Sequence, residues 1–179
     1  MIASADKKFV FLCAPKTGST AVEKAFRPFA EFKVTNKPKW KHINYNQLHD
    51  IFGEYFEKKG CRIYVVVRDP VETLVSWYKY RSRNALRDPN HPNTRKYTGD
   101  ISFEQFIEEW GSKRPPSRAR VGLPTNFVLT RNGEIAPIYF FRYESITTLW
   151  DTLAEHVGHR PNFERKNVSP DRSVNVYRE

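Results

Sequence analysis

The stretch that decides the fold is Lys8-Phe-Val-Phe-Leu-Cys-Ala14, followed at once by Pro15-Lys-Thr-Gly-Ser-Thr20 and Ala21-Val-Glu-Lys-Ala-Phe-Arg27. The first part is a nearly continuous apolar run, which is typical of a strand buried on both faces of a sheet. The last part has a helix pattern, and Pro28 stops it. A buried strand, a short turn with a glycine and a helix together predict a βα unit.

A second stretch of the same kind lies further along the chain. Arg62-Ile-Tyr-Val-Val-Val67 is β-branched and does not alternate, and Pro70 stands where the first turn of a helix over 71–83 would begin. Two buried strands that each lead into a helix indicate parallel pairing with helices on both faces. The sequence therefore predicts an α/β fold in three layers, with a central, mostly parallel sheet and a P-loop-type strand-loop-helix that binds phosphate.

The remaining elements are expected to complete this fold. Helix patterns cover 46–58, 102–110 and 145–157, and the second of these begins at a capping Ser102. We expect an antiparallel hairpin in which 127–130 and 138–141 pair around the turn Asn132-Gly133.

Composition limits the classes of protein that the chain can be. Its 179 residues predict one domain, and two cysteines are too few for a disulfide scaffold. The formal net charge of +10 predicts an anionic partner. No apolar run approaches the ~20 residues of a membrane span, and the first residues do not resemble a signal peptide. We therefore expect a cytoplasmic protein, or the soluble catalytic part of a membrane-anchored parent.

The turn at 15–20 has the composition of an anion site. A loop between a strand and a helix directs backbone N–H groups and the positive end of the helix toward one point. Gly18 allows close approach, Lys16 adds a positive charge, and hydroxyls follow at the next two positions. The lysine precedes the glycine, so this is not the usual nucleotide-triphosphatase loop. The alternative is an ordinary connection with Ser19 as a helix cap.

A second group of polar residues follows the second strand. Arg68 comes at its carboxyl end, where open α/β sheets bind ligands, and Ser76 lies in the next helix on the side expected to face it. An arginine fork with a hydroxyl suits a terminal phosphate. The alternative is a local ion pair between Arg68 and Asp69, with Asp69 capping the helix.

With both motifs on the right elements, the chain resembles the sulfotransferases that use 3′-phosphoadenosine 5′-phosphosulfate (PAPS). Pro15-Lys-Thr-Gly-Ser-Thr20 is similar to their 5′-phosphosulfate loop, and Arg68-Asp-Pro70 with Ser76 is similar to their 3′-phosphate motif. The likeness covers most of 8–157 and implies one sulfotransferase-like domain over 1–179. Three further segments resemble the carbohydrate-sulfotransferase branch: Lys41-His42, Asn132-Gly-Glu134 and Phe141-Arg-Tyr-Glu144.

The resemblance implies transfer of a sulfuryl group from PAPS to a hydroxyl of a glycan or a small compound, with 3′-phosphoadenosine 5′-phosphate (PAP) as product. Lys16 would be catalytic, because it would stabilise the oxygen that leaves. No metal and no nucleic-acid partner are expected. The implied donor-binding residues are Pro15, Lys16, Thr17, Gly18, Ser19, Thr20, Arg68 and Ser76.

The general base should be a histidine or a carboxylate. His42 is the first candidate, because related sugar sulfotransferases place a catalytic histidine in a comparable segment between the two PAPS motifs. Its alternative is a hydrogen-bonding residue at a helix start. Glu23 is the rival, since other branches use a glutamate downstream of the loop. It stands only seven residues past Lys16, which fits a surface charge better.

The acceptor side is expected over 84–123, where the resemblance is thinnest. Its basic loops favour an anionic acceptor, and Trp77, Tyr78 and Tyr80 could stack on sugar rings unless they belong to a core. A segment near the C-terminus, 166–169, resembles one that returns to the 3′-phosphate region. The candidate acceptor-binding residues are Arg81, Arg83, Arg142 and Glu144.

Two other functions stay open at this point. A small P-loop kinase would bind similar ligands, but its Gly-Lys-Ser/Thr order is missing. A nucleic-acid-binding domain fits the net charge, but the common nucleic-acid motifs are not found in the sequence. The three functions differ in ligand: PAP, ATP with magnesium, or an oligonucleotide bound with a steep salt dependence.

Overall fold

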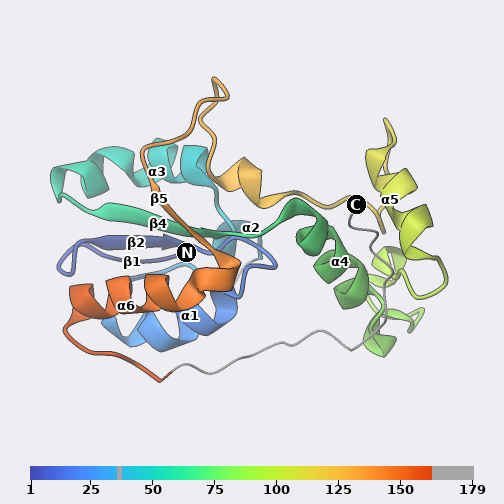
Figure 1. Cartoon of the computed structure of the whole chain (residues 1–179), viewed down its shortest axis with the longest axis horizontal. Coiled ribbons are helices and arrows are strands. Elements are labelled where there is room, and N and C mark those ends of the chain that lie inside the picture. Colours follow the sequence, from blue (N-terminus) through green and yellow to red (C-terminus); the bar gives the residue numbers. More distant parts are fainter. Residues whose placement is uncertain (36–37, 163–179) are drawn as a thin grey trace. The chain divides into compact units, whose positions relative to one another are not determined.

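The computed structural model describes residues 1–35 and 38–162 (Figure 1). These residues form two compact units. The first combines 1–69 with the described residues from Pro124 onward, and the second is 70–123. The length predicts a single domain, and whether the two units form one domain stays open to that prediction.

The first unit is built on a five-stranded sheet in the order β3-β1-β2-β4-β5. Strands β2 and β4 are parallel, as are β4 and β5, whereas β1 runs antiparallel to both β2 and β3. The strands are β1 (Ile2–Ser4), β2 (Phe9–Leu12), β3 (Phe32–Lys33), β4 (Arg62–Val67) and β5 (Tyr139–Arg142). The helices of this unit are α1 (Ser19–Phe26), α2 (Pro38–Lys41), α3 (Tyr45–Lys58) and α6 (Ile146–Val157), and short 3-10 turns are η1 (Arg27–Phe29), η4 (Pro124–Phe127) and η5 (Tyr143–Ser145).

Helices cover both faces of this sheet, with α3 on one side and α1 and α6 on the other (Figure 1). Alternation along β2 explains the two cores. Phe9 and Phe11 pack into the core that includes Trp150 of α6, and Val10 and Leu12 pack into the core that includes Leu48 of α3. Because every side chain of β2 is buried on one face or the other, the strand reads as a continuous apolar run.

The parallel half of the sheet sets the position of the site. Leu12 pairs with Val65, and Val67 pairs with Arg142. The carboxyl ends of β2, β4 and β5 therefore lie at one edge, where ligands bind in open α/β sheets.

The second unit has a core of its own around Leu74, Tyr78 and Phe106. Ser102 caps its last helix, because the Ser102 hydroxyl accepts a hydrogen bond from the Gln105 amide at 3.2 Å. Its elements are α4 (Pro70–Arg81), η2 (Asn84–Leu86), η3 (Thr94–Lys96) and α5 (Phe103–Gly111).

The α/β fold with its strand-loop-helix is confirmed, and two details differ from the expectation. The sheet is mixed, because the short strands β1 and β3 add antiparallel pairs that no sequence pattern indicated. The hairpin is much shorter than predicted, with a single bridge between Leu129 and Ile135. Pro137 has no amide hydrogen to continue that ladder, and β5 beyond it pairs in parallel with β4.

Candidate active site

The loop between β2 and α1 is shaped by its own hydroxyl groups. Thr17 Oγ1 and Ser19 Oγ both donate to the carbonyl of Ala14 at 2.8 Å, and both residues are buried. Gly18 is the N-cap of α1, and no side chain caps this helix. The ordinary connection with a capping Ser19 is therefore not observed. The Ser19 hydroxyl folds the loop, and the start of α1 keeps the positive character that attracts an anion.

Gly18 is required here for two reasons. Its φ of 70° lies in the left-handed region. A Cβ at this position would lie 3.1 Å from Tyr143 Cε2 and 3.1 Å from Ile146 Cδ1. Lys16 also has a positive φ, 65°, although it is not a glycine. A non-glycine residue in this region is strained, and such strain gathers at functional sites.

Arg68 reaches the same loop from the end of β4. Its Nη1 donates to the Lys16 carbonyl at 3.3 Å, and its guanidinium lies 4.5 Å from the centroid of the Tyr143 ring. The cation–π contact and the hydrogen bond together orient the guanidinium. The strand end, the loop and the aromatic ring after β5 are thus connected through one side chain.

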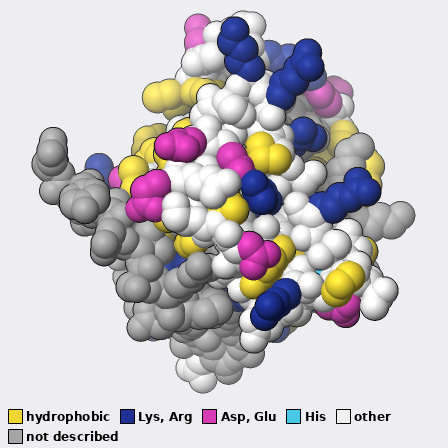
Figure 2. Space-filling model, turned by 90° about the vertical axis from the view of Figure 1, so that its right-hand side faces the viewer, with side chains coloured by type: hydrophobic (Ala, Val, Ile, Leu, Met, Phe, Trp, Pro, Cys, Tyr) yellow, Lys and Arg dark blue, Asp and Glu magenta, His cyan; other side chains and the backbone are white. Residues whose placement is uncertain are grey.

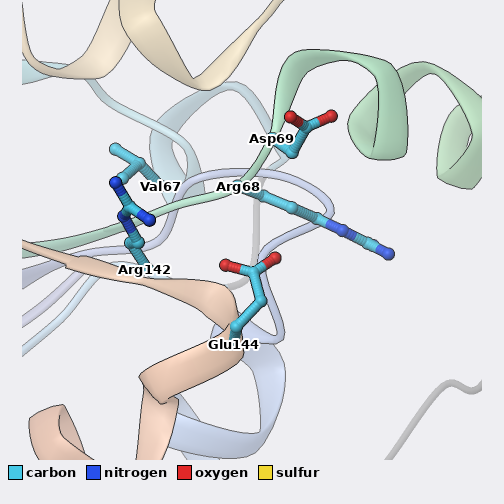
Figure 3. Close-up of a pocket in the computed structure, with 5 residues that line it drawn as sticks. All are labelled: Val67, Arg68, Asp69, Arg142 and Glu144. Atoms are coloured by element: carbon cyan, nitrogen blue, oxygen red, sulfur yellow. The ribbon is translucent and has the colours of Figure 1, made fainter. Parts of the chain in front are cut away.

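A pocket of about 290 Å³ opens beside Arg68 (Figure 3). Its lining brings Arg142 and Glu144, both proposed from the sequence, together with Arg68. The Glu144 carboxylate stands between the two arginine side chains in the close-up. A pocket with both charges suits a polar ligand that carries anionic groups and hydroxyls. The lining residues are Val67, Arg68, Asp69, Arg142 and Glu144.

Ser76, Arg81 and Arg83 belong to the second unit. Ser76 lies within α4 and is partly buried. Arg83 lies over the ring of Tyr80, 4.5 Å from its centroid. Tyr78 is a core residue at 3% exposure.

The structure gives Arg81 a different setting from the expected acceptor contact. This residue is only 5% exposed, and burial lowers its pKa to about 10, so it stays charged at neutral pH. Its guanidinium lies 5.0 Å from the Trp77 ring and donates to the carbonyls of Ser117, Arg118 and Arg120 at 2.8–3.2 Å. These contacts favour a structural role, closing the loop after α5 onto the end of α4.

His42 lies between α2 and α3, with Nδ1 2.5 Å from the carbonyl of Cys13, the residue after β2. A carbonyl can only accept, so Nδ1 carries the hydrogen and Nε2 keeps its lone pair. Burial lowers the pKa of His42, and the hydrogen bond to Cys13 opposes this in part. The imidazole is therefore neutral at pH 7 and can accept a proton.

Glu23 is not the surface charge expected from the sequence. It is 4% exposed, and its Oε2 forms an ion pair with Lys41 Nζ at 2.7 Å. A carboxylate that is enclosed and paired in this way is a poor candidate for the base. The expectation failed because Lys41 is 18 positions away, beyond any local pattern.

Three groups that contribute to the site are not singled out by the sequence. They are the ring of Tyr143, the carbonyl of Cys13 and the ammonium group of Lys41. In the sequence, Lys41 and Tyr143 are recognised only as members of the segments that resemble the carbohydrate-sulfotransferase branch. A main-chain carbonyl has no sequence signal at all.

Some expectations concern features that the described residues do not decide. The segment 166–169 lies outside them. Within 1–35 and 38–162, no group of three or more metal-ligating side chains is found. In the same residues, no helix combines the length and the apolar character that a membrane crossing needs.

Comparisons with known proteins bear on the family and the fold of the chain. The model of the sulfotransferase family matches residues 1–172. The crystal structure of mouse sulfotransferase SULT7A1 complexed with PAP superposes with a TM-score of 0.50 at 17% identity, over 90% of this chain. The match covers 62% of the mouse chain, and at this identity it shows a common fold. No protein of curated function matches the sequence.

Proposed function

Since the chain belongs to the sulfotransferase family, we propose that it transfers a sulfuryl group from PAPS to a hydroxyl group of an acceptor. The observation that carries this proposal is the connection between the two phosphate motifs. The Lys16 carbonyl of the strained loop accepts a hydrogen bond from Arg68 at the end of the neighbouring parallel strand. The PAP bound to the mouse neighbour supports the choice of donor.

Donor binding is assigned to the loop and the arginine at the carboxyl edge of the sheet, and the resemblance adds Ser76 of α4. The loop 15–20 would hold the 5′-phosphosulfate through its amides and Lys16, and Arg68 with Ser76 would hold the 3′-phosphate. A contact with the 3′-phosphate selects PAPS over ATP, which lacks that group. The charged hydrogen bonds of an arginine fork to phosphate are strong enough for such discrimination.

The transfer itself needs one base and one stabilised leaving group. The acceptor oxygen forms a bond to sulfur while the bond between sulfur and the 5′-phosphate oxygen breaks. His42 Nε2 takes the hydroxyl proton, since Nδ1 is engaged by Cys13. Lys16 stabilises the negative charge that develops on the leaving oxygen.

We propose that the acceptor binds against Arg142 and Glu144 in the pocket beside Arg68. Arg83, which belongs to the second unit, stays a candidate from the sequence alone. A glycan fits this chemistry, because carboxylate and guanidinium groups hydrogen-bond to hydroxyls. Figure 2 shows Lys and Arg side chains interspersed with Asp and Glu on the face drawn there, rather than one continuous basic patch. Arg81 drops out of the acceptor site, because its guanidinium is bound to three backbone carbonyls.

Calorimetric titration tests the donor directly, with PAP, AMP and ATP–magnesium run side by side. We expect tight binding of PAP and at least ~10-fold weaker binding of AMP, the value for the loss of one charged hydrogen-bond set. Preference for ATP–magnesium would favour the kinase, and binding only of an oligonucleotide would favour the nucleic-acid domain. Equal affinity for PAP and AMP would refute the 3′-phosphate site.

A further inference from the structure

The ion pair between Glu23, which is buried, and Lys41, which is partly buried, lies among residues of the site. The Glu23 side chain is 5% exposed and the Lys41 side chain 19%. Glu23 lies on α1, the helix that begins at the phosphate loop, and Lys41 is the last residue of α2, directly before His42. The pair therefore joins the helix behind the donor loop to the segment that carries the candidate base.

A second contact joins the same two segments. His42 Nδ1 is bonded to the Cys13 carbonyl, which lies just before the loop. The ion pair and this hydrogen bond act on neighbouring residues and attach both to the β2-loop-α1 unit. The hydrogen bond limits rotation of the imidazole, and the ion pair fixes the residue directly before it. A base needs such constraint to meet a proton at a fixed place.

A buried ion pair is a weak source of stability, because desolvating both charges offsets much of their attraction. Its place beside His42 suggests another use. We propose that Glu23 and Lys41 form a positioning pair, which holds His42 against the Cys13 carbonyl with Nε2 available to the acceptor. This inference rests on the proposed role of His42 as the base.

The charges around His42 make the proposal testable by pH. Lys41 and the Met1 amino group, which is 2.6 Å from the Lys41 carbonyl, lower the pKa of His42, whereas Glu23 raises it. Burial raises the pKa of the Cys13 thiol, so that group is uncharged at neutral pH. Removing one member of the pair thus leaves the charge of the other uncompensated. Loss of Glu23 should lower the pKa of His42, and loss of Lys41 should raise it.

The experiment uses Glu23→Gln, Lys41→Met and the double variant. We expect each single change to lower kcat by up to about 100-fold, as small misplacements of catalytic groups do, with PAP affinity within about 3-fold. The acid limb of kcat/KM should move to lower pH in Glu23→Gln and to higher pH in Lys41→Met. In the double variant the limb should return toward its original place. Lys41→Arg keeps the positive charge, so the acid limb of kcat/KM should stay at its wild-type pH.

The matched control is the exposed pair Glu54–Lys58 on α3, with side chains 81% and 72% exposed. Glu54→Gln and Lys58→Met should change neither kcat nor the pH profile. Shifts of the acid limb in the same direction for both buried variants, or full kcat in Glu23→Gln, would overturn the proposal. If one single variant does not fold, the other decides the proposal, because an acid limb that does not move in the expected direction there would refute it.

Nuclear magnetic resonance of the His42 imidazole separates this proposal from the role of the base. The wild-type protein should show the Nδ1–H tautomer, and the His42 pKa should move in opposite directions in the two single variants. If these shifts occur while His42→Ala keeps its turnover, the pair holds His42 but the base lies elsewhere. If the tautomer and the pKa stay unchanged in both variants, the positioning pair is refuted whatever the activity.

Discussion

Arg68 directly follows the strand β4, Arg81 is the last residue of the next helix, α4, and both are candidate anion ligands from the sequence. Arg68 lies over an aromatic ring and lines a pocket. Arg81 also contacts an aromatic ring, but it is buried, and backbone carbonyls receive its hydrogen bonds. Arg68 also donates to one carbonyl, that of Lys16, but its side chain still lines a pocket, whereas three carbonyls engage the Arg81 guanidinium. The difference teaches that the use of an arginine depends on how far the folded main chain occupies its guanidinium, which the neighbouring sequence does not show.

The largest effect is expected at Lys16, whose carbonyl receives the hydrogen bond from Arg68. Lys16→Ala should lower turnover by about 10²–10³-fold, the usual cost of losing a donor that stabilises developing charge. The fold should be intact, as judged by thermal unfolding. Lys24→Ala, at an exposed residue of the helix α1 that follows the loop, is the control. Comparable losses in both variants would contradict the role of Lys16.

Arg81→Met tests the structural half of the comparison. Three carbonyls lose a charged donor, so the free energy of unfolding should fall by about 2–3 kcal/mol. Chemical denaturation measures this loss. Arg83→Met, on the partly buried residue just after α4, should cost less than about 0.5 kcal/mol. A stable Arg81→Met protein with weakened acceptor binding would return Arg81 to the acceptor site.

Arg68→Ala tests the other side of the comparison, the proposed binding of the 3′-phosphate by Arg68. Its affinity for PAP should fall by about 10- to 100-fold, and its affinity for AMP should fall much less, because only PAP carries the 3′-phosphate. Titration calorimetry reads both. Arg62→Ala removes an exposed arginine at the start of β4, the strand that leads to Arg68, and should leave both affinities unchanged. Equal losses for PAP and AMP would mean that Arg68 supports the loop without binding the 3′-phosphate.

Gly18→Ala should have a smaller effect on the same region. The left-handed φ costs about 1–2 kcal/mol for alanine, and the added Cβ presses on Tyr143, the ring beneath Arg68. We expect this loss of stability in thermal unfolding, with a modest weakening of PAP binding. Gly133→Ala shares the positive φ, but no atom lies within 4 Å of its Cβ, so it isolates the backbone cost.

The smallest effect is the contribution of His42 to stability. Its pKa in the folded protein lies below the ordinary value of 6.5, so the unfolded chain binds the proton more readily. This contribution is complete above pH 6.5 and is lost as the pH falls from there toward the folded pKa. Unfolding midpoints measured across this window should fall less in His42→Gln than in the wild type.

Local patterns were enough for the βα units and for the loop that begins at Pro15. A buried strand, a turn with glycine and a helix start are adjacent in sequence, so their geometry follows from adjacent residues. The segment 127–141 was predicted wrongly as a long hairpin, because a turn signal at Asn132-Gly133 says nothing about which strand β5 will pair with. Pairing of β5 with β4 is decided by residues about 75 positions apart.

The residues of the candidate site also fall into two groups, those that local sequence identifies and those that depend on distant segments. Lys16 and Gly18 could be identified from the loop itself, and Arg142 and Glu144 could be named as candidates, but their position beside Arg68 in one pocket appears only in the structure. The burial of Glu23 and the carbonyl partners of Arg81 could not be predicted, since both depend on segments that meet only in the folded chain.

The position of Cys13 makes it a native reporter of the loop. Its thiol has 0% exposure, whereas Cys61 is only partly buried. A thiol reagent will modify Cys61 from the folded state and can reach Cys13 only when the segment between β2 and α1 opens. The slow phase of labelling in the unmodified protein therefore measures the frequency of that opening, and its slowing by a nucleotide would report occupancy of the loop without radioactivity or an acceptor.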